Sequence, residues 1–323
     1  MTRHHSLSGG AGSWLAAKVD MSAHPREDHH FLFADTLYED ADCYRFLIEG
    51  LAFLLGRSVS KVLPRAEDFP DYRVAGDFDI ATYAGNPEWR RFLAHLRADV
   101  AAILPELTWL VEGRDPWEVF RDRKFLGNSR IDPCSKVLKR EILDGWRREN
   151  ANAATDVFCI GIGPHEAHRY HRLADRMAAE GWLYEAPLLG TFAGEVGAFG
   201  YMKNAGIELP RLYDKNYMHN NCGGFCIKAG HAHYKNRFYA DPDRYAYDAM
   251  MERKLAEYIG KPITMLTDRA GDNTKKPLSL DEFGNRLRAN PQLNFDYLPG
   301  TSGCGCMIDE PSNDNLSPDE AAA

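Results

Sequence analysis

The hexapeptide Ser8-Gly9-Gly10-Ala11-Gly12-Ser13 decides the predicted fold. It follows a short candidate strand, His4 to Leu7, and precedes a candidate helix that runs through Trp14 and Lys18. The three glycines can adopt positive φ and have no Cβ, so consecutive backbone N–H groups can converge on one anion. The Ser13 hydroxyl and the N-terminus of the helix add donors and a partial positive charge. We therefore interpret this segment as a phosphate-binding loop, with an ordinary glycine-rich turn as the alternative.

Two better-known phosphate motifs do not describe this loop. The Walker pattern requires a Lys-Ser/Thr pair after the last glycine, and none follows Gly12. The dinucleotide pattern G-x-G-x-x-G requires a different glycine spacing. The loop is therefore a phosphate-binding candidate of another kind.

Composition limits the class of protein. A chain of 323 residues with 44% hydrophobic residues can bury one large core, or a core plus a smaller module. The formal net charge of -8 argues against a protein that coats nucleic acid or membrane through general electrostatics. No apolar run is long enough to span a bilayer, and polar His4 and His5 occupy the place where a signal peptide needs an apolar stretch. We expect a cytoplasmic protein.

Short apolar runs alternate with helical patterns, which predicts a doubly wound parallel sheet of five strands. The predicted strands are 4–7, 30–34, 58–63, 156–160 and 183–188. Residues 64–130 interrupt this alternation and are predicted to form a helical insertion. In such a sheet, ligands bind beyond the carboxyl ends of the strands.

Three residues at predicted strand ends are candidates for nucleotide binding. Asp35 ends the second strand and is expected to lie beside the phosphate-binding loop. Its carboxylate could accept from a ribose hydroxyl or an adenine amine, bind Mg²⁺ on the phosphates, or simply cap the next helix. Gly161 and Gly163 follow the fourth strand and would allow adenine to approach closely.

Cys134 lies in a predicted helix start. The Asp-Pro pair at 132–133 marks the first turn, so the helix dipole, Lys136 and Lys139 would favour a thiolate at Cys134. A small buried cysteine is the alternative. Basic residues exceed acidic ones from 114 to 148, which fits an anionic substrate and equally a solvated helix face.

The seven cysteines are odd in number and unevenly spaced, which favours reduced thiols or a metal site over a disulfide framework. Five thiols could converge on a metal centre: Cys134, Cys222, Cys226, Cys304 and Cys306. They would suit an iron-sulfur cluster (4Fe-4S) or tetrahedral Zn²⁺, and His231 and His233 would favour zinc if they joined. Several unrelated reduced cysteines are the alternative. Cys43 and Cys159 sit in apolar patterns and are predicted to be core residues.

Composition changes after residue 208. We predict a nucleotide-binding α/β domain at 1–208 and a mainly helical, cysteine-containing C-terminal module at 209–308. The acidic residues 309–323 are rich in Pro, Ser and Asn and are predicted to be disordered.

Four stretches in this order resemble the phosphoadenosine phosphosulfate (PAPS) reductase-like family of the PP-loop (adenine nucleotide alpha hydrolase-like) superfamily. Ser8-Gly9-Gly10 with Ser13 is similar to the family's SGG-x-D-S loop. The run from Asp35 through Glu39, followed by Tyr44-Arg45-Phe46, is similar to its D-T-G-x-x-x-x-E-T-Y-x-F strand end. Cys134 with Lys139 is similar to its C-x-x-x-K-x-x-P helix. Pro187-Leu188, followed by Leu212-Tyr213-Asp214 and Cys222, is similar to its P-L … L-Y-x-x-G-Y … C run. Together these stretches span most of 8–226.

The chain departs from the family pattern at several positions. Ala11-Gly12 replaces the x-Asp of the loop, Leu37 stands where the family has glycine, and Asn216 replaces the glycine before Tyr217. The reductases carry a catalytic cysteine in a Glu-Cys-Gly tail, whereas this chain has Gly-Cys-Gly-Cys at 303–306. The tail therefore favours a branch other than the reductases.

The resemblance implies an enzyme that adenylates an acceptor with ATP, releases pyrophosphate and transfers sulfur to a nucleic acid or small molecule. Relatives that thiolate often hold an iron-sulfur cluster on cysteines placed like Cys134, Cys222 and Cys226. One of Cys304 and Cys306 would complete that set, here assigned to Cys304. The other, Cys306, would then act as the free catalytic thiol, with Lys139 and Asp35.

The resemblance also implies partners and alternatives. A cysteine desulfurase could donate the sulfur, and the chain could form a homo-oligomer. The first alternative is a PAPS or adenylyl-sulfate reductase that releases sulfite with thioredoxin as reductant. The second is a nucleotide- or zinc-binding module without turnover.

Overall fold

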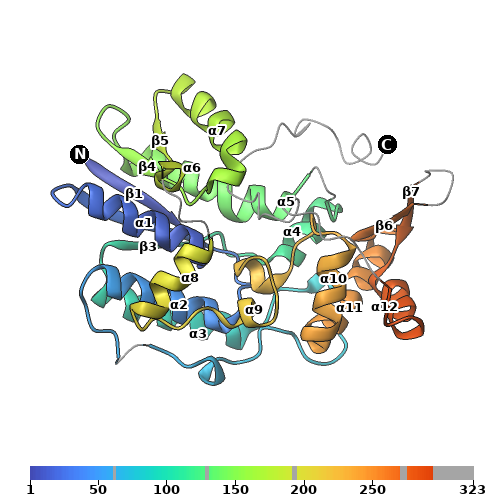
Figure 1. Ribbon diagram of the computed structural model, residues 1–323. Helices are drawn as coiled ribbons and strands as arrows, with labels where there is room; N and C mark the ends of the chain where they lie inside the picture. The colour runs from blue at the N-terminus through green and yellow to red at the C-terminus, as the bar shows by residue number, and fades with distance from the viewer. Residues whose placement is uncertain (61–62, 128–130, 191–194, 270–274, 294–323) are drawn as a thin grey trace.

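A parallel five-stranded sheet forms the centre of the protein (Figure 1). The computed structural model describes residues 1–60, 63–127, 131–190, 195–269 and 275–293. The sheet order is β3-β2-β1-β4-β5, from β1 (Thr2–Leu7), β2 (Asp28–Asp35), β3 (Leu107–Val111), β4 (Val157–Cys159) and β5 (Leu183–Glu185). The predicted α/β class with five parallel strands is confirmed, and the sheet is compatible with a Rossmann-like fold.

The edge strand β3 differs from the prediction. We expected the third strand at 58–63, but residues 58–60 and 63 belong to no strand, and 61–62 fall outside the described residues. The strand comes instead from residues 107–111, within the segment predicted to be a helical insertion, and pairs Trp109 with Phe33. The six residues 58–63 contain only three apolar ones, and so short a pattern cannot separate a strand from a loop that buries one side chain, here Val59.

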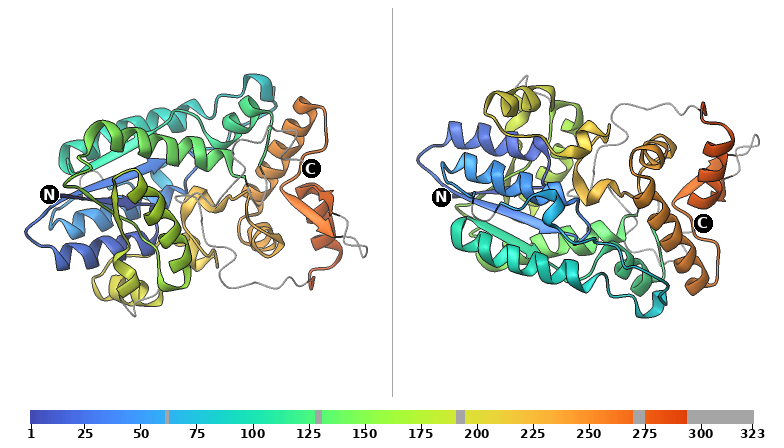
Figure 2. Two further views of the ribbon diagram at one scale, coloured as in Figure 1. Left: turned by 90° about the horizontal axis from the view of Figure 1, so that it is seen from above. Right: turned by 90° about the horizontal axis from the view of Figure 1, so that it is seen from below.

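Helices cover both faces of the sheet (Figures 1 and 2). On one face lie α1 (Ala11–Ala23), α2 (Ala41–Leu54) and α3 (Pro87–Ile103), and on the other α6 (Ile142–Asn150) and α7 (Ala167–Ala179). Alternation along β1 assigns its side chains to these layers. The His5 ring stacks on Phe31 with centroids 5.0 Å apart, while His4 lies 5.2 Å from Trp146 of α6.

Several helix starts follow the sequence signals. The Asp115 side chain caps α4 (Pro116–Arg123) and forms a capping box with Glu118. A short α5 (Pro133–Ser135) begins after Asp132 and continues as a π-helical segment, Lys136–Glu141, before α6. The C-terminal part of the described chain contains α8 (Glu195–Asn204), α9 (Arg211–Asp214), α10 (His231–Ala240), α11 (Pro242–Ile259), the antiparallel strands β6 (Leu266–Arg269) and β7 (Lys275–Leu278), and α12 (Leu280–Ala289).

A buried ion pair joins α10 to α11, and Tyr38, which follows β2, forms a hydrogen bond to this pair. Arg237 of α10 donates to Asp248 of α11 over 2.6 Å, and both side chains are fully buried. Asp248 also accepts from the Tyr38 hydroxyl, and Arg237 donates to the Gly223 carbonyl. Within the described part of the chain, no helix has the length and apolar character needed to cross a membrane.

Candidate functional site

The glycine-rich loop joins β1 to α1 where the strand order reverses between β1 and β4, which is the usual ligand-binding crevice of open parallel sheets. Gly9 has φ +73°, and an added Cβ would lie 2.2 Å from Cys43 Sγ, so only glycine fits there. The Ser13 hydroxyl accepts from the Ser8 amide over 3.1 Å and donates to the Gly10 carbonyl over 3.0 Å. The loop is thus already closed in front of the first turn of α1, whose leading amides have no intrahelical acceptors.

Gly161 lies against this loop, and the expected contact of Gly161 and Gly163 with adenine stays a prediction. A Cβ at Gly161 would lie 2.6 Å from Ser13 Cα, so the end of β4 contacts the backbone of α1 directly. A Cβ at Gly163 would lie 3.1 Å from the His165 ring. The lack of a side chain at Gly161 therefore allows the residues after β4 to pack directly against the backbone of α1.

Two residues that the sequence did not single out as ligands also contact the loop. The Tyr213 hydroxyl accepts from the Ala11 amide over 3.1 Å, and the Asn220 amide group donates to the Gly9 carbonyl over 2.7 Å. Asn220 is fully buried, and its Oδ1 has no hydrogen-bond partner. Only the L-Y-D stretch hinted at Tyr213, and no pattern pointed to Asn220.

Asp35 ends β2 as predicted, but other groups of the protein bind its carboxylate. It accepts from the Leu37 amide (2.8 Å), the Tyr44 hydroxyl (2.8 Å) and the Trp109 indole (3.0 Å). The side chain is 1% exposed, and burial raises its pKa above the ordinary value. Asp35 therefore joins β2, α2 and β3.

Three of the predicted metal ligands line one cavity. Cys134, Cys222 and Cys226 surround a space of about 20 Å³ together with Thr36 and Lys139, and we call this the thiol pocket. Burial, followed by the neighbouring thiols, raises the pKa of Cys134 well above its usual range. Cys304 and Cys306 lie outside the described residues. Cys43 and Cys159 are buried, as predicted.

A buried lysine and a buried glutamate border the thiol pocket. Lys139 Nζ lies 3.4 Å from Cys222 Sγ and 3.7 Å from a Glu39 carboxylate oxygen. Glu39 accepts from the Thr36 hydroxyl over 3.0 Å and from the Cys222 amide. Burial raises the pKa of Glu39 to about 7, against the opposing effect of Lys139. Lys139 therefore borders the thiol pocket, and its catalytic role stays a prediction, while Glu39 was part of the family pattern but was not proposed as a site residue.

Three non-glycine residues around the site have left-handed backbones: Leu37 (φ 57°), Asn216 (φ 60°) and Cys222 (φ 52°). Leu37 and Asn216 are the two positions where the resembled family has glycine. The chain therefore keeps the backbone conformation that glycine would adopt freely. Residues held in this region cluster at binding and catalytic sites.

The two histidines that could have joined a zinc site lie elsewhere. His233 is buried, with Nε2 2.7 Å from the Gly224 carbonyl oxygen. His231 packs edge-on against Phe283, with ring centroids 5.4 Å apart. Neither side chain lines the thiol pocket.

These observations define an α/β protein with a Rossmann-like sheet, a closed glycine-rich loop and an adjacent pocket of thiols. Protein-family models, curated proteins and solved structures provide no match to the chain. A proposal for the function of the protein therefore depends on the geometry of the loop and the thiol pocket.

Proposed function

We propose that this protein is an adenine-nucleotide-dependent enzyme of the PP-loop kind, related to the PAPS reductase-like family. It adenylates an acceptor with ATP and couples this step to sulfur transfer onto a nucleic acid or small molecule. The cytoplasm, where thiols stay reduced, suits this chemistry. One observation carries the proposal: residues 220–222 connect the two sites, because Asn220 hydrogen-bonds Gly9 while Cys222 lines the thiol pocket.

The phosphate-binding loop supplies the nucleotide half of the reaction. Loop amides other than those of Ser8 and Ala11, which donate to Ser13 and Tyr213, would hold the β- and γ-phosphates of ATP together with the positive end of α1. An acceptor oxygen attacks the α-phosphorus, the bond to the bridging oxygen breaks, and pyrophosphate leaves with the electron pair. A sulfur nucleophile then displaces AMP from the activated acceptor. Donors fixed before the reaction stabilise the leaving pyrophosphate without reorganising.

The thiol pocket would supply the sulfur half. Three cysteines around one cavity match part of the ligand set of an iron-sulfur cluster or of zinc, with Cys304 proposed as the fourth ligand. Such a centre would bind sulfur or order the pocket. Lys139 places a buried cation beside the Cys222 sulfur. Cys306 stays the proposed relay thiol: it accepts the outer sulfur of a cysteine desulfurase persulfide, that sulfur displaces AMP, and an external thiol reduces the resulting disulfide to release the thiolated acceptor.

Asp35 does not fit the expected contact with Mg²⁺ or ribose. Its carboxylate is buried and accepts three hydrogen bonds from the protein. We therefore assign Asp35 a positioning role, since it orients the turn at Leu37 that leads to Glu39. No step of the proposed reaction passes through Mg²⁺.

The test is pyrophosphate release from ATP by the full chain in the presence of sulfide or a desulfurase. We expect Ser13→Ala to lower the rate at least about tenfold, because it removes the hydroxyl that closes the loop and holds its amides in position. Ser22→Ala is the matched control. Ser22 lies on the same helix, and its exposed hydroxyl donates only to the Lys18 carbonyl.

Other outcomes select other functions. Sulfite release from PAPS, without pyrophosphate release from ATP, would support a reductase and contradict the proposal. Nucleotide binding that Ser13→Ala weakens, with no turnover of ATP or PAPS, would support a regulatory module.

A further inference from the structure

The central strand of the sheet carries unusual residues. Parallel strands that are buried on both faces are mostly apolar, yet Arg3, His4 and His5 of β1 are each no more than 4% exposed. Buried polar groups require partners. On the face toward α1 these partners are Asp20 and His29. They gather at the end of the sheet where β1 and β2 begin, opposite the phosphate-binding loop.

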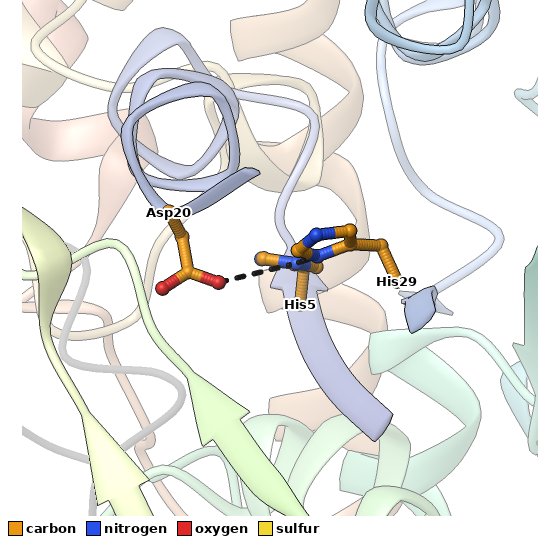
Figure 3. A group of neighbouring side chains, drawn as sticks. All are labelled: His5, Asp20 and His29. Carbon is orange, nitrogen blue, oxygen red and sulfur yellow. Dashed lines mark hydrogen bonds and ion pairs between the residues drawn. The ribbon is translucent and has the colours of Figure 1, made fainter. Parts of the chain in front are cut away.

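Three potential ligand atoms converge on this face (Figure 3). They are His5 Nε2 from β1, His29 Nδ1 from the start of β2, and a carboxylate oxygen of Asp20 from α1, and all lie within 4.8 Å of one another. His5 Nε2 is 2.9 Å from His29 Nδ1 and 3.6 Å from Asp20 Oδ2. In a tetrahedral zinc site with bonds of about 2.0–2.1 Å, ligand atoms are separated by about 3.3 Å. The observed separations are close to that value.

The surroundings orient two of the three ligands, His29 and Asp20, as in known metal sites, while His5 Nδ1 is buried without a hydrogen-bond partner. His29 Nε2 lies 3.0 Å from the His24 carbonyl oxygen, so Nε2 carries the proton and Nδ1 offers its lone pair to the site. Arg3 donates to both oxygens of Asp20, over 2.7 and 2.6 Å. Ligating carboxylates commonly have such hydrogen bonds on their outer side.

The charged side chains around the site have a net negative charge that a divalent cation would neutralise. Arg3 is the cation of the group, and it faces three carboxylates, Asp20, Glu27 and Glu185. With neutral histidines this cluster carries two net negative charges, which one divalent ion would balance. His24 offers a route to solvent, because its side chain is 36% exposed and its Nε2 lies 3.9 Å from Asp20 Oδ1.

We infer that His5, Asp20 and His29 form a binding site for a zinc-class divalent cation at the amino edge of the sheet. Two imidazoles and one carboxylate suit Zn²⁺ and leave a fourth position toward solvent. The ion would connect β1, β2 and α1 at a place distant in the fold from the thiol pocket. This inference does not depend on the proposed enzymatic activity.

The experiment is a calorimetric titration of metal-free, full-length protein with Zn²⁺. Because the thiol pocket can also take zinc, the informative quantity is the difference between variants. We expect His29→Gln to remove one site or weaken it at least about tenfold. His30→Gln, which changes the next residue on the opposite face of β2, should keep it. Circular dichroism of both metal-free variants checks that they fold like the wild type.

A second measurement uses Co²⁺ in place of Zn²⁺. The wild-type spectrum minus the His29→Gln spectrum should contain visible bands of tetrahedral Co²⁺ without thiolate charge-transfer absorption. Equal numbers and affinities of sites in the wild type and His29→Gln would overturn the inference. A thiolate signature in the difference spectrum would also overturn it, since it would assign the lost ion to cysteines.

Discussion

A methyl group at residue 161 would collide with the backbone of the glycine-rich loop where it enters α1. The added Cβ would lie 2.6 Å from Ser13 Cα and 2.9 Å from its nitrogen, and neither atom can move aside like a flexible side chain. We predict that Gly161→Ala pushes β4 away from α1. Nucleotide affinity, measured by fluorescence titration with an ATP analogue, should fall at least about tenfold because the donor positions shift.

Gly145→Ala is the control for this substitution. Gly145 lies inside α6, and a Cβ there meets no atom within 4 Å. Because alanine favours helix over glycine, stability should rise by about 0.5–1 kcal/mol while nucleotide affinity stays the same. Unchanged affinity in Gly161→Ala would show that nucleotide binds away from this loop.

At the residue scale, the sequence was a better guide to which side chains lie close together than to the role of each side chain. Cys134, Cys222 and Lys139 meet as the family pattern implied. The role of Asp35 could not be predicted, because its partner Trp109 lies on a strand that the sequence did not identify. Asn220 was missed for a similar reason, since a buried amide is recognised only through the contact it makes.

The turn that carries Cys222 depends on the ion pair between α10 and α11. Arg237 binds both Asp248 and the Gly223 carbonyl, so it connects these helices to the residue next to Cys222. We predict that Asp248→Asn lowers the free energy of unfolding by about 3–5 kcal/mol, because a buried arginine loses its counter-charge. Urea unfolding measures this change.

Asp281→Asn tests the same chemistry at the surface. Asp281 pairs with Arg253 over 2.6 Å, but both side chains are about half exposed. Exposed pairs contribute about 0–1 kcal/mol, so this variant should unfold almost like the wild type. Equal losses in the two variants would mean that burial does not control the strength of the Asp248 pair.

At the element scale, helix starts carry local signals that an edge strand lacks. Caps such as Asn86 before α3 and Asp115 before α4 mark helix starts through local hydrogen bonds that the sequence itself encodes. The edge strand β3 is defined by pairing with β2, which lies more than 70 residues away along the chain. Its five residues had too little periodicity to reveal that pairing.

Buried neutral histidines make the whole molecule sensitive to acid. Burial lowers the pKa of His233 to about 3 and that of His30 to about 4, from 6.5. Between these values and 6.5 the unfolded chain binds more protons than the folded one, so stability is retained above pH 6.5 and falls as the pH drops. The slope is at most about 1.4 kcal/mol per pH unit for each histidine.

Urea unfolding at about pH 7 and about pH 5.5 tests this prediction. His233→Gln should make the loss of stability between the two pH values smaller, because glutamine does not titrate and can still donate to the Gly224 carbonyl. His168→Gln, at an exposed position of α7, is the control. An identical pH dependence in His233→Gln and the wild type would refute the role of His233.

The position of β1 in the middle of the sheet has a consequence during protein synthesis. β1 leaves the ribosome shortly before β2, which can pair along one of its sides, but β4, which pairs along the other side, follows only after roughly 150 further residues. Meanwhile the other side of β1 is an unpaired edge. Charged or polar side chains such as Arg3, His4 and His5 discourage nascent chains from pairing along such an edge. The residues that make this strand hard to bury would thus also protect the growing polypeptide from aggregation.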